Sequence, residues 1–414
     1  MTGQRIHSFP PLKREDDQPW LFGPGFNRAV KDSGWTCLQN PVASFTLNGD
    51  DRDVVSAERV ATALRSVKAF AEDIPKGGAI AGYLAYEVAA GLEPSLSFPS
   101  SPDGLPLILM RKYEAIQSIP ELPIVACDLL QSNIDKTDDP SAYVSKAARV
   151  IDHVLAGDIF QANISRRQSA YFNASSRIVA PSIFQRLVGD DPAPYAAFLP
   201  FSSGAILSNS PELFLKVDGR TITAEPVKGT RARHPNQQED AIVAAGLAKD
   251  EKERAENIMI ADLLRNDLAK VCEDHSILEP VICAVRTLPH VHHLYSRICG
   301  RLRKGEGAMD ALLAAFPCGS VTGAPKHEAM RIIAKEEKEG RGPYCGTVFY
   351  IPHDGAAVFS VPIRTGALYD DGGRARLDVR SGGGVTVLSD PAREYQETVD
   401  KAYPFRAMTL AERD

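Results

Sequence analysis

The sequence lacks several features that would assign it to a familiar class of protein. None of its seven cysteines forms a Cys-x-x-Cys pair, so neither a zinc site nor thioredoxin-type chemistry is indicated. There is no run of lysine or arginine, and a net charge of −6 gives no reason to expect nucleic acid as a partner. No apolar run approaches membrane-spanning length, and the amino terminus has no apolar core of the signal-peptide kind. We therefore expect a cytoplasmic protein with reduced cysteines and no membrane contact.

What is present is an ordinary globular composition, with 44% hydrophobic and 24% charged residues in a chain of 414. This length suffices for a large core or two subdomains. Residues 1–40 are rich in proline, glycine and charge and predict an irregular lead-in. From Ser141 onward, apolar residues recur at helical spacing as far as Gly157. We divide the chain into an amino-terminal part, 1–140, and a catalytic region, 141–414.

Residues 208–230 hold a carboxylate and an amine on either side of a predicted hairpin. Apolar and polar residues alternate up to Asp218-Gly219, a strong two-residue turn signal, and a second strand follows. Because a hairpin returns its ends to one edge of a sheet, Glu212 and Lys228 are expected to lie close together. The alternative is a surface hairpin with an ordinary salt bridge.

Two further carboxylate clusters lie on predicted helices. Residues 238–271 form the longest helical stretch, interrupted at Gly246, and contain Glu256. Glu394 and Glu397 are one turn apart on the last helix. Each cluster alone is typical of a solvated helix face. Together they could supply carboxylates to one magnesium ion (Mg²⁺), which binds few carboxylates along with water and ligand oxygens.

Two glycine-rich segments could present backbone amides to a carboxylate. Residues 319–326 superficially resemble a phosphate loop, but Pro325 removes an amide donor and His327 stands where Ser or Thr is required. Residues 381–384 are not a dinucleotide fingerprint. Either segment can still form an anion-binding nest, and the alternative for each is a tight turn.

Arg364-Thr365 adds a guanidinium and a hydroxyl group that suit a carboxylate. His293 lies among apolar neighbours, where a histidine is more often a core residue than a catalyst. Taken together, the residues indicate a dianionic small molecule, a magnesium ion, an acid and an amine.

Ten segments, in this order, resemble the chorismate-utilising enzymes. They are DIFQANIS, SPELFL, EPVKGTRAR, RAENIMIADLLRNDLAKV, VHHLYSRICG, FPCGSVTGAPKHEAM, YCGTV, IRT, SGGG and DPAREYQETVDKA. The dense match runs from about Ser141 to Ala402. The resemblance implies one α+β fold in which two large, mainly antiparallel β-sheets pack face to face, with helices outside and substrate between the layers.

Within this family, two positions separate the reactions. Isochorismate-forming members carry a water-activating lysine where this chain has Gln161, which implies an amine nucleophile. Anthranilate-forming members carry a small residue where this chain has Lys228, and the lysine is similar to that of aminodeoxychorismate-forming members. There the lysine attacks ring carbon 2 of chorismate while the 4-hydroxyl leaves, and ammonia then adds at carbon 4. An unperturbed lysine is almost wholly protonated at neutral pH, so this amine must lose its proton before it attacks.

The resemblance assigns the remaining roles residue by residue. Glu212 is the acid that protonates the departing hydroxyl, and His293 lies beside it. The magnesium ligands are Glu256 and Glu397, with Glu394 nearby. The expected substrate-binding residues are Gln161, Thr322, Gly323, Lys326, Tyr344, Arg364, Thr365, Gly382, Gly383 and Gly384.

Ammonia in this family comes from a glutamine amidotransferase subunit. This chain has no Gly-x-Cys-x-Gly nucleophile elbow, so we expect such a partner. Cys318 stands where a glycine is usual, and His327-Glu328 replaces a more common apolar-basic pair; both departures are expected to alter the rim of the pocket. Two alternatives stay open. One is the anthranilate-forming reaction, which expels pyruvate, and the other is a non-catalytic chorismate-binding subunit.

Overall fold

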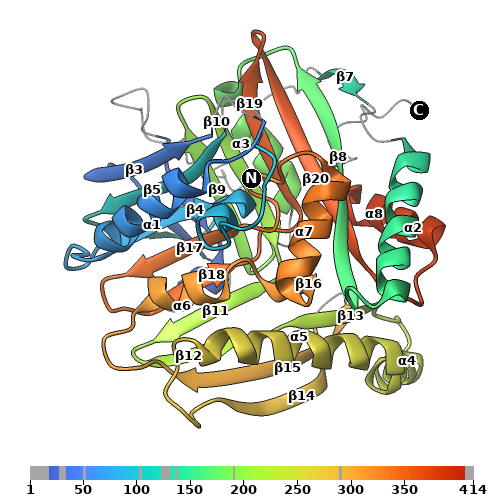
Figure 1. The fold of residues 1–414 in the computed structure, drawn as a ribbon. Helices are drawn as coiled ribbons and strands as arrows, with labels where there is room; N and C mark the ends of the chain where they lie inside the picture. Colours follow the sequence, from blue (N-terminus) through green and yellow to red (C-terminus); the bar gives the residue numbers. More distant parts are fainter. Residues whose placement is uncertain are drawn as a thin grey trace.

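The computed structural model describes residues 18–27, 34–49, 53–101, 105–122, 131–135, 139–189, 192–288 and 291–405. Two ten-stranded β-sheets form the centre of the molecule, and helices cover their outer sides (Figure 1). Every strand pair in both sheets is antiparallel. The expected α+β class with two large antiparallel sheets is confirmed.

The first sheet joins strands from both ends of the chain. Its order is β16 (Gly323–Ala324), β8 (Gln161–Phe172), β20 (Arg374–Val385), β19 (Thr365–Asp371), β10 (Gly204–Ser210), β9 (Tyr195–Phe201), β1 (Trp20–Phe22), β2 (Trp35–Leu38) and β6 (Gln117–Ile119), with β7 (Gln131–Asp135) beside β8.

The second sheet carries the hairpin with the acid and the amine. Its order is β13 (Val227–Ala232), β15 (Val291–Arg301), β12 (Thr221–Ala224), β11 (Leu213–Asp218), β18 (Ala357–Ser360), β17 (Thr347–Pro352), β4 (Ala79–Leu84), β5 (Pro106–Tyr113) and β3 (Ala43–Asn48), with β14 (Leu278–Thr287) beside β15.

The largest hydrophobic core includes the residues packed between the two sheets and also buried residues of the helices at 57–71, 251–269 and 308–315. Because side chains alternate along a strand, successive residues of β9 and β10 enter different cores. Leu199 and Ile206 pack with second-sheet residues such as Phe359 in the central core. Phe198 and Leu207 face the other way and pack in a smaller core under helix α3 (Ser176–Val188). The face-to-face packing of the sheets follows from this alternation.

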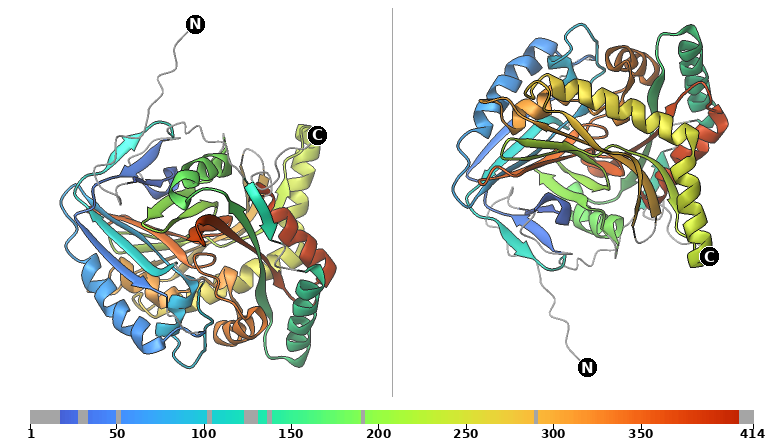
Figure 2. Two further views of the ribbon diagram at one scale, coloured as in Figure 1. Left: turned by 90° about the horizontal axis from the view of Figure 1, so that it is seen from above. Right: turned by 90° about the horizontal axis from the view of Figure 1, so that it is seen from below.

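The remaining helices are α1 (Ala57–Ala71), α2 (Pro140–Ala156), α4 (Gln237–Lys249), α5 (Glu251–Ala269), α6 (Ala308–Ala315), α7 (Lys326–Glu337) and α8 (Pro391–Lys401), and three 3₁₀ turns are η1 (Pro24–Phe26), η2 (Tyr86–Gly91) and η3 (Gly319–Val321). Helix α5 crosses the outer side of β13, β14 and β15 (Figure 2). Helices α2 and α8 pack together, and α8 also packs on β20. Each of these two begins at a proline after an aspartate N-cap, whose side chain accepts a backbone N–H.

Three expectations about local structure are wrong. The lead-in is not irregular throughout, because β1 and β2 lie within it and pair with each other. The long helical stretch breaks at Asp250 instead of Gly246, because the Asp250 side chain caps α5 by accepting from the backbone of Glu253. The β11–β12 turn is Gly219-Arg220, one residue later than expected, since Asp218 still pairs with Thr221 and Gly219 has φ +57°.

Strands from residues 18–122 lie in both sheets, so the amino-terminal part builds the same two layers as the rest. The division at residue 140 stays a prediction. Within the described ranges, no helix combines the length and the apolar character needed to cross a bilayer. The six cysteines in these ranges are free thiols, and Cys127 lies outside them.

Candidate active site

A cavity of about 630 Å³ is lined by residues from both sheets and from α5 and α8. This volume is in the range of small-molecule sites. Ten of the expected site residues line it: Glu212, Lys228, Glu256, His293, Tyr344, Arg364, Gly382, Gly384, Glu394 and Glu397.

Sheet register brings the acid and the amine to this cavity. Glu212 directly precedes β11, while Lys228 lies in β13, beyond the end of β12. Both β12 and β13 pair with β15 along one edge, and the register shifts between Lys228 and Thr230. The β11–β12 hairpin forms as expected, and β13, which continues along β15 beyond the end of β12, carries the amine.

Glu212 is a buried carboxyl group with 8% of its surface exposed. Burial raises its pKa, and a hydrogen bond from Ser320 and the charges of Lys228 and Lys401 only partly oppose that shift. The Ser320 hydroxyl donates to Glu212 Oε1 over 2.6 Å. A carboxyl group with a raised pKa can hold a proton near neutral pH and deliver it as a general acid.

Lys228 lies near several carboxylates, and among the described residues none of them makes a short contact with its ammonium group. Its Nζ lies 3.9 Å from Glu256 Oε2, and 14% of each side chain is exposed. That distance is an ion pair and is too long for a hydrogen bond. The other oxygen of Glu256 lies 3.9 Å from Nζ of Lys252, one turn earlier on α5.

The three expected metal ligands come from α5 and α8. Burial raises the pKa of both Glu256 and Glu394. Burial acts in the same direction on Glu397, but the ammonium groups of Lys401, 2.6 Å away, and of Lys228 and Lys252 together outweigh it and lower the pKa of that carboxyl. A Cβ at Gly383 would lie 2.9 Å from Glu394 Oε2 and 3.8 Å from Glu397 Oε1, so both carboxylates approach one point of β20.

Oxygen donors of this kind fit a hard divalent cation. Within the ranges that the structure describes, however, no three His, Cys, Asp or Glu side chains are grouped as a metal site. The magnesium assignment therefore stays a prediction.

Residues 382–384 lie in β20 and pair with β8, so they do not form the expected nest. A nest requires alternating backbone handedness, whereas none of these three glycines has a positive φ. Glycine is required here because neighbouring side chains lie very close to the strand. A Cβ at Gly384 would lie 2.3 Å from the side-chain nitrogen of Gln161. The strand thereby makes room for polar side chains around the cavity.

His293 and Arg364 line the cavity near each other. Burial lowers the pKa of His293, and the charge of Arg364 adds to this effect. The Nδ1 atom of His293 is 2.9 Å from the hydroxyl of Thr230. This histidine is therefore suited to act as a neutral hydrogen-bonding group.

The other expected substrate-binding residues do not line the cavity. Lys326 donates to the carbonyl of Ala315 over 2.7 Å and pairs with buried Asp267, so its ammonium is used within the protein. Thr322 is fully buried and donates to the carbonyl of Cys318 over 3.1 Å. Three more lie in the surrounding strands: Gly323 in β16, Thr365 in β19 and Gly383 in β20.

Gln161 is also outside the lining but adjoins it through Gly384. It is 1% exposed, and neither polar atom of its side chain has a hydrogen-bond partner in the described part of the chain. An unpaired buried amide is costly unless a ligand or water satisfies it.

Several polar lining residues were not assigned from the sequence, among them Asn163, Lys252, Ser320, Arg380 and Lys401. The two lysines carried a signal, since each lies four residues from a predicted metal ligand on the same helix. Nothing local distinguishes Ser320 or Arg380.

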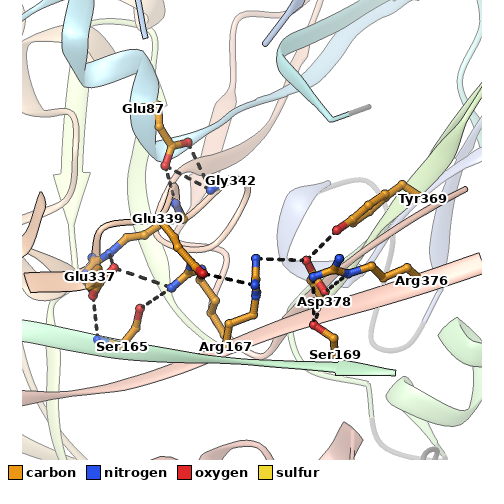
Figure 3. A network of polar contacts seen from close by, with 12 residues as sticks. Glu87, Ser165, Arg167, Ser169, Glu337, Glu339, Gly342, Tyr369, Arg376 and Asp378 are labelled. Atoms are coloured by element: carbon orange, nitrogen blue, oxygen red, sulfur yellow. Dashed lines mark hydrogen bonds and ion pairs between the residues drawn. The ribbon is translucent and has the colours of Figure 1, made fainter. Parts of the chain in front are cut away.

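A buried ionic network, part of which Figure 3 shows, reaches residues that line the cavity. Glu337 accepts two hydrogen bonds from Arg341, of 2.7 and 2.9 Å, and one from the backbone of Ser165. Arg341 also donates to the carbonyls of Val321 and Asn163. Since Val321 and Asn163 line the cavity, the network fixes part of its wall.

Comparisons with known proteins agree with this arrangement. The chorismate binding enzyme family matches residues 126–407. Anthranilate synthase component 1 of Streptomyces coelicolor is 40% identical over 272 residues, 66% of this chain and 51% of that protein. Aminodeoxychorismate synthase component 1 of Escherichia coli is 39% identical over 271 residues, 66% and 57% of the two. The chain thus spans about half the length of these curated relatives.

The solved anthranilate synthase component I of Streptococcus pneumoniae TIGR4 superimposes with a TM-score of 0.72 at 26% identity. That comparison covers 99% of this chain and 95% of that one.

Proposed function

Because the chain belongs to the chorismate binding enzyme family, we propose that it aminates chorismate at ring carbon 4, as aminodeoxychorismate synthase component 1 does. The product, 4-amino-4-deoxychorismate, leads to para-aminobenzoate and folate. The observation that carries the proposal is the presence of Lys228 and Glu212 in one cavity. An amine in that position supplies a nucleophile, and the buried acid supplies a proton.

In the proposed reaction, the neutral amine of Lys228 forms a bond to ring carbon 2. Both ring double bonds shift, the bond from carbon 4 to oxygen breaks, and the hydroxyl leaves as water with the proton of Glu212. Hydroxide is a poor leaving group, and general acid help of this kind is worth ~10²–10⁴-fold in rate. Ammonia then adds at carbon 4, both double bonds shift back, the bond from carbon 2 to nitrogen breaks and Lys228 is released.

The cavity also offers groups for the two carboxylates of chorismate. Arg364 and Lys401 line it and carry positive charge, which a protein with a net charge of −6 must gather locally. Glu256, Glu394 and Glu397 would hold Mg²⁺. When bound, this ion neutralises negative charge on a substrate carboxylate.

A glutamine amidotransferase partner is proposed as the source of ammonia, with free ammonium as a weaker substitute. The second candidate function is that of anthranilate synthase, since relatives of that name are as similar as the aminodeoxychorismate synthases. The two reactions differ in product. Anthranilate formation expels pyruvate, whereas carbon-4 amination retains the enolpyruvyl group.

The test is incubation with chorismate, Mg²⁺ and ammonium, with and without an aminodeoxychorismate lyase. We expect para-aminobenzoate only when the lyase is present. Anthranilate fluorescence and pyruvate in its absence would instead identify the second candidate.

The Lys228→Ala variant tests the role of the amine. Loss of the nucleophile should lower the rate of carbon-4 amination by more than about 10³-fold. The matched control is Lys252→Ala, because Lys252 also lies 3.9 Å from Glu256 but is 44% exposed. We expect the control to lose far less activity in the same assay. Undiminished amination by Lys228→Ala would rule out covalent lysine catalysis.

A further inference from the structure

Two small side chains from one turn lie next to the carboxyl group of Glu212. Ser320 belongs to η3, and Cys318 immediately precedes that turn. The Ser320 Oγ is 2.6 Å from Glu212 Oε1, and the Cys318 Sγ is 3.2 Å from Ser320 Oγ. Cys318 and Ser320 are 2% and 4% exposed. The three groups form a buried chain that ends on the acid.

The chemistry of the three groups determines which of them donates and which accepts in each hydrogen bond. A serine hydroxyl has one proton, and here it is donated to Glu212. Ser320 must then accept from Cys318. Burial and the nearby charge of Glu212 raise the pKa of the Cys318 thiol to about 12, so this thiol keeps its proton at neutral pH and can donate it.

We propose that Ser320, oriented by Cys318, is a positioning residue that determines which oxygen of Glu212 carries the acid proton. Because Oε1 is already an acceptor, the proton resides on Oε2, which has no hydrogen bond from any described residue. After the proton leaves, the same hydrogen bond stabilises the carboxylate. The inference rests on the proposed function of Glu212 as an acid and adds how its proton is placed.

Other groups act on Glu212 from the elements packed around it. The ammonium groups of Lys228 and Lys401 favour its charged form, and the thiol of Cys345 interacts with it electrostatically. These groups are unchanged when Ser320 or Cys318 is substituted. A change in the titration of Glu212 in those variants therefore reports on the hydrogen bonds that join Cys318, Ser320 and Glu212.

The experiment compares Ser320→Ala, Cys318→Ala and Cys318→Ser with the wild type. Two quantities are measured against pH: kcat for chorismate consumption, and the infrared carboxyl band of ¹³C-labelled glutamate that is absent in Glu212→Gln. Removing a hydrogen bond to a carboxylate should raise the pKa of Glu212, so the alkaline limb of Ser320→Ala should move up by about one to two pH units. Its plateau in kcat should fall by about tenfold, since the proton is no longer confined to one oxygen.

The cysteine variants separate orientation from packing. Cys318→Ser keeps a donor of similar size and should retain the wild-type titration. Cys318→Ala should shift it in the same direction as Ser320→Ala, but less. Unchanged titration in Ser320→Ala would overturn the proposal, and so would equal behaviour of the two cysteine variants. The infrared titration requires no turnover, so it decides this proposal even if the wild type proves to form anthranilate.

Discussion

The cavity carboxyl groups of Glu212 and Glu256 and the ionic network beside the cavity are built from the same residue types but treat charge in opposite ways. In the network, Arg341 and Glu337 are 3% and 6% exposed, and two hydrogen bonds join them. Burial would raise the pKa of Glu337, but Arg341, together with Arg380 and the backbone N–H of Ser165, outweighs burial and lowers that pKa. In the cavity, burial prevails and raises the pKa of Glu212 and Glu256.

The difference lies in how completely each carboxylate is paired. Glu256 has two lysines at 3.9 Å and no shorter ion pair in the described residues, whereas Glu337 has a bidentate guanidinium. A buried charge that is fully hydrogen-bonded has little capacity left for a ligand. The paired carboxylate therefore stabilises the wall, while incompletely paired carboxylates remain available to substrate, a metal ion or a proton.

The network also reaches the amino-terminal part of the chain. Glu87, in η2, accepts from the backbone of Gly342 over 3.1 Å and from the hydroxyl of Ser101 over 2.8 Å. It also accepts from the backbone of Arg341. The segment that carries Arg341 is thereby tied to residues that precede the matched family region.

The largest expected effect comes from removing the acid on the cavity side. Glu212→Gln preserves shape but cannot donate the proton, so kcat should fall by ~10²–10⁴-fold. Because the acid works only when protonated, wild-type activity should decline as pH rises through the raised pKa of Glu212. The variant should lack that limb. A pH series of kcat measures both, and a normal rate in the variant would remove Glu212 from the mechanism.

Breaking the Arg341–Glu337 pair of the ionic network should lower the stability of the folded protein. Arg341→Met leaves Glu337 buried without its guanidinium, which costs about 3–5 kcal/mol when a buried pair loses one partner. Urea unfolding measures the loss. The double variant Arg341→Met/Glu337→Leu should recover part of it, because no unpaired carboxylate remains, although the backbone groups that the pair had bonded lose their partners. A double variant as unstable as the single one would contradict this account.

The smallest effect is expected from an exposed ion pair on α7, the helix that ends at Glu337. Glu328 and Arg331 lie one turn apart on α7, with 29% and 47% of their side chains exposed. Arg331→Met should change the free energy of unfolding by less than about 0.5 kcal/mol, because water and salt screen such pairs. Measured beside Arg341→Met, it is the control for losing an arginine from this part of the chain. A loss of unfolding free energy as large as that of Arg341→Met would show that burial and pairing do not explain the difference between the two arginines.

Much of the local structure and most of the site were predictable from the sequence. Asp390-Pro391 begins α8 because an aspartate cap and a proline at the first position favour a helix start. The carboxylates of Glu394 and Glu397 were expected on one face of that helix, and both line the cavity. The prediction for residues 382–384 was wrong. A run of glycines suits an anion-binding nest, and it equally suits a strand that neighbouring side chains approach closely. Only the tertiary contacts distinguish the two.

The sequence by itself therefore determined the elements whose causes are local: helix caps, strand alternation and the spacing of charges along a helix. Only the tertiary structure decided which distant groups share an environment. Glu212 and Ser320 are 108 residues apart and meet because separate strands and a turn converge. Whether a carboxyl is left incompletely paired or joined to a guanidinium depends on that convergence, since burial and pairing are set by contacts that no short stretch of sequence contains.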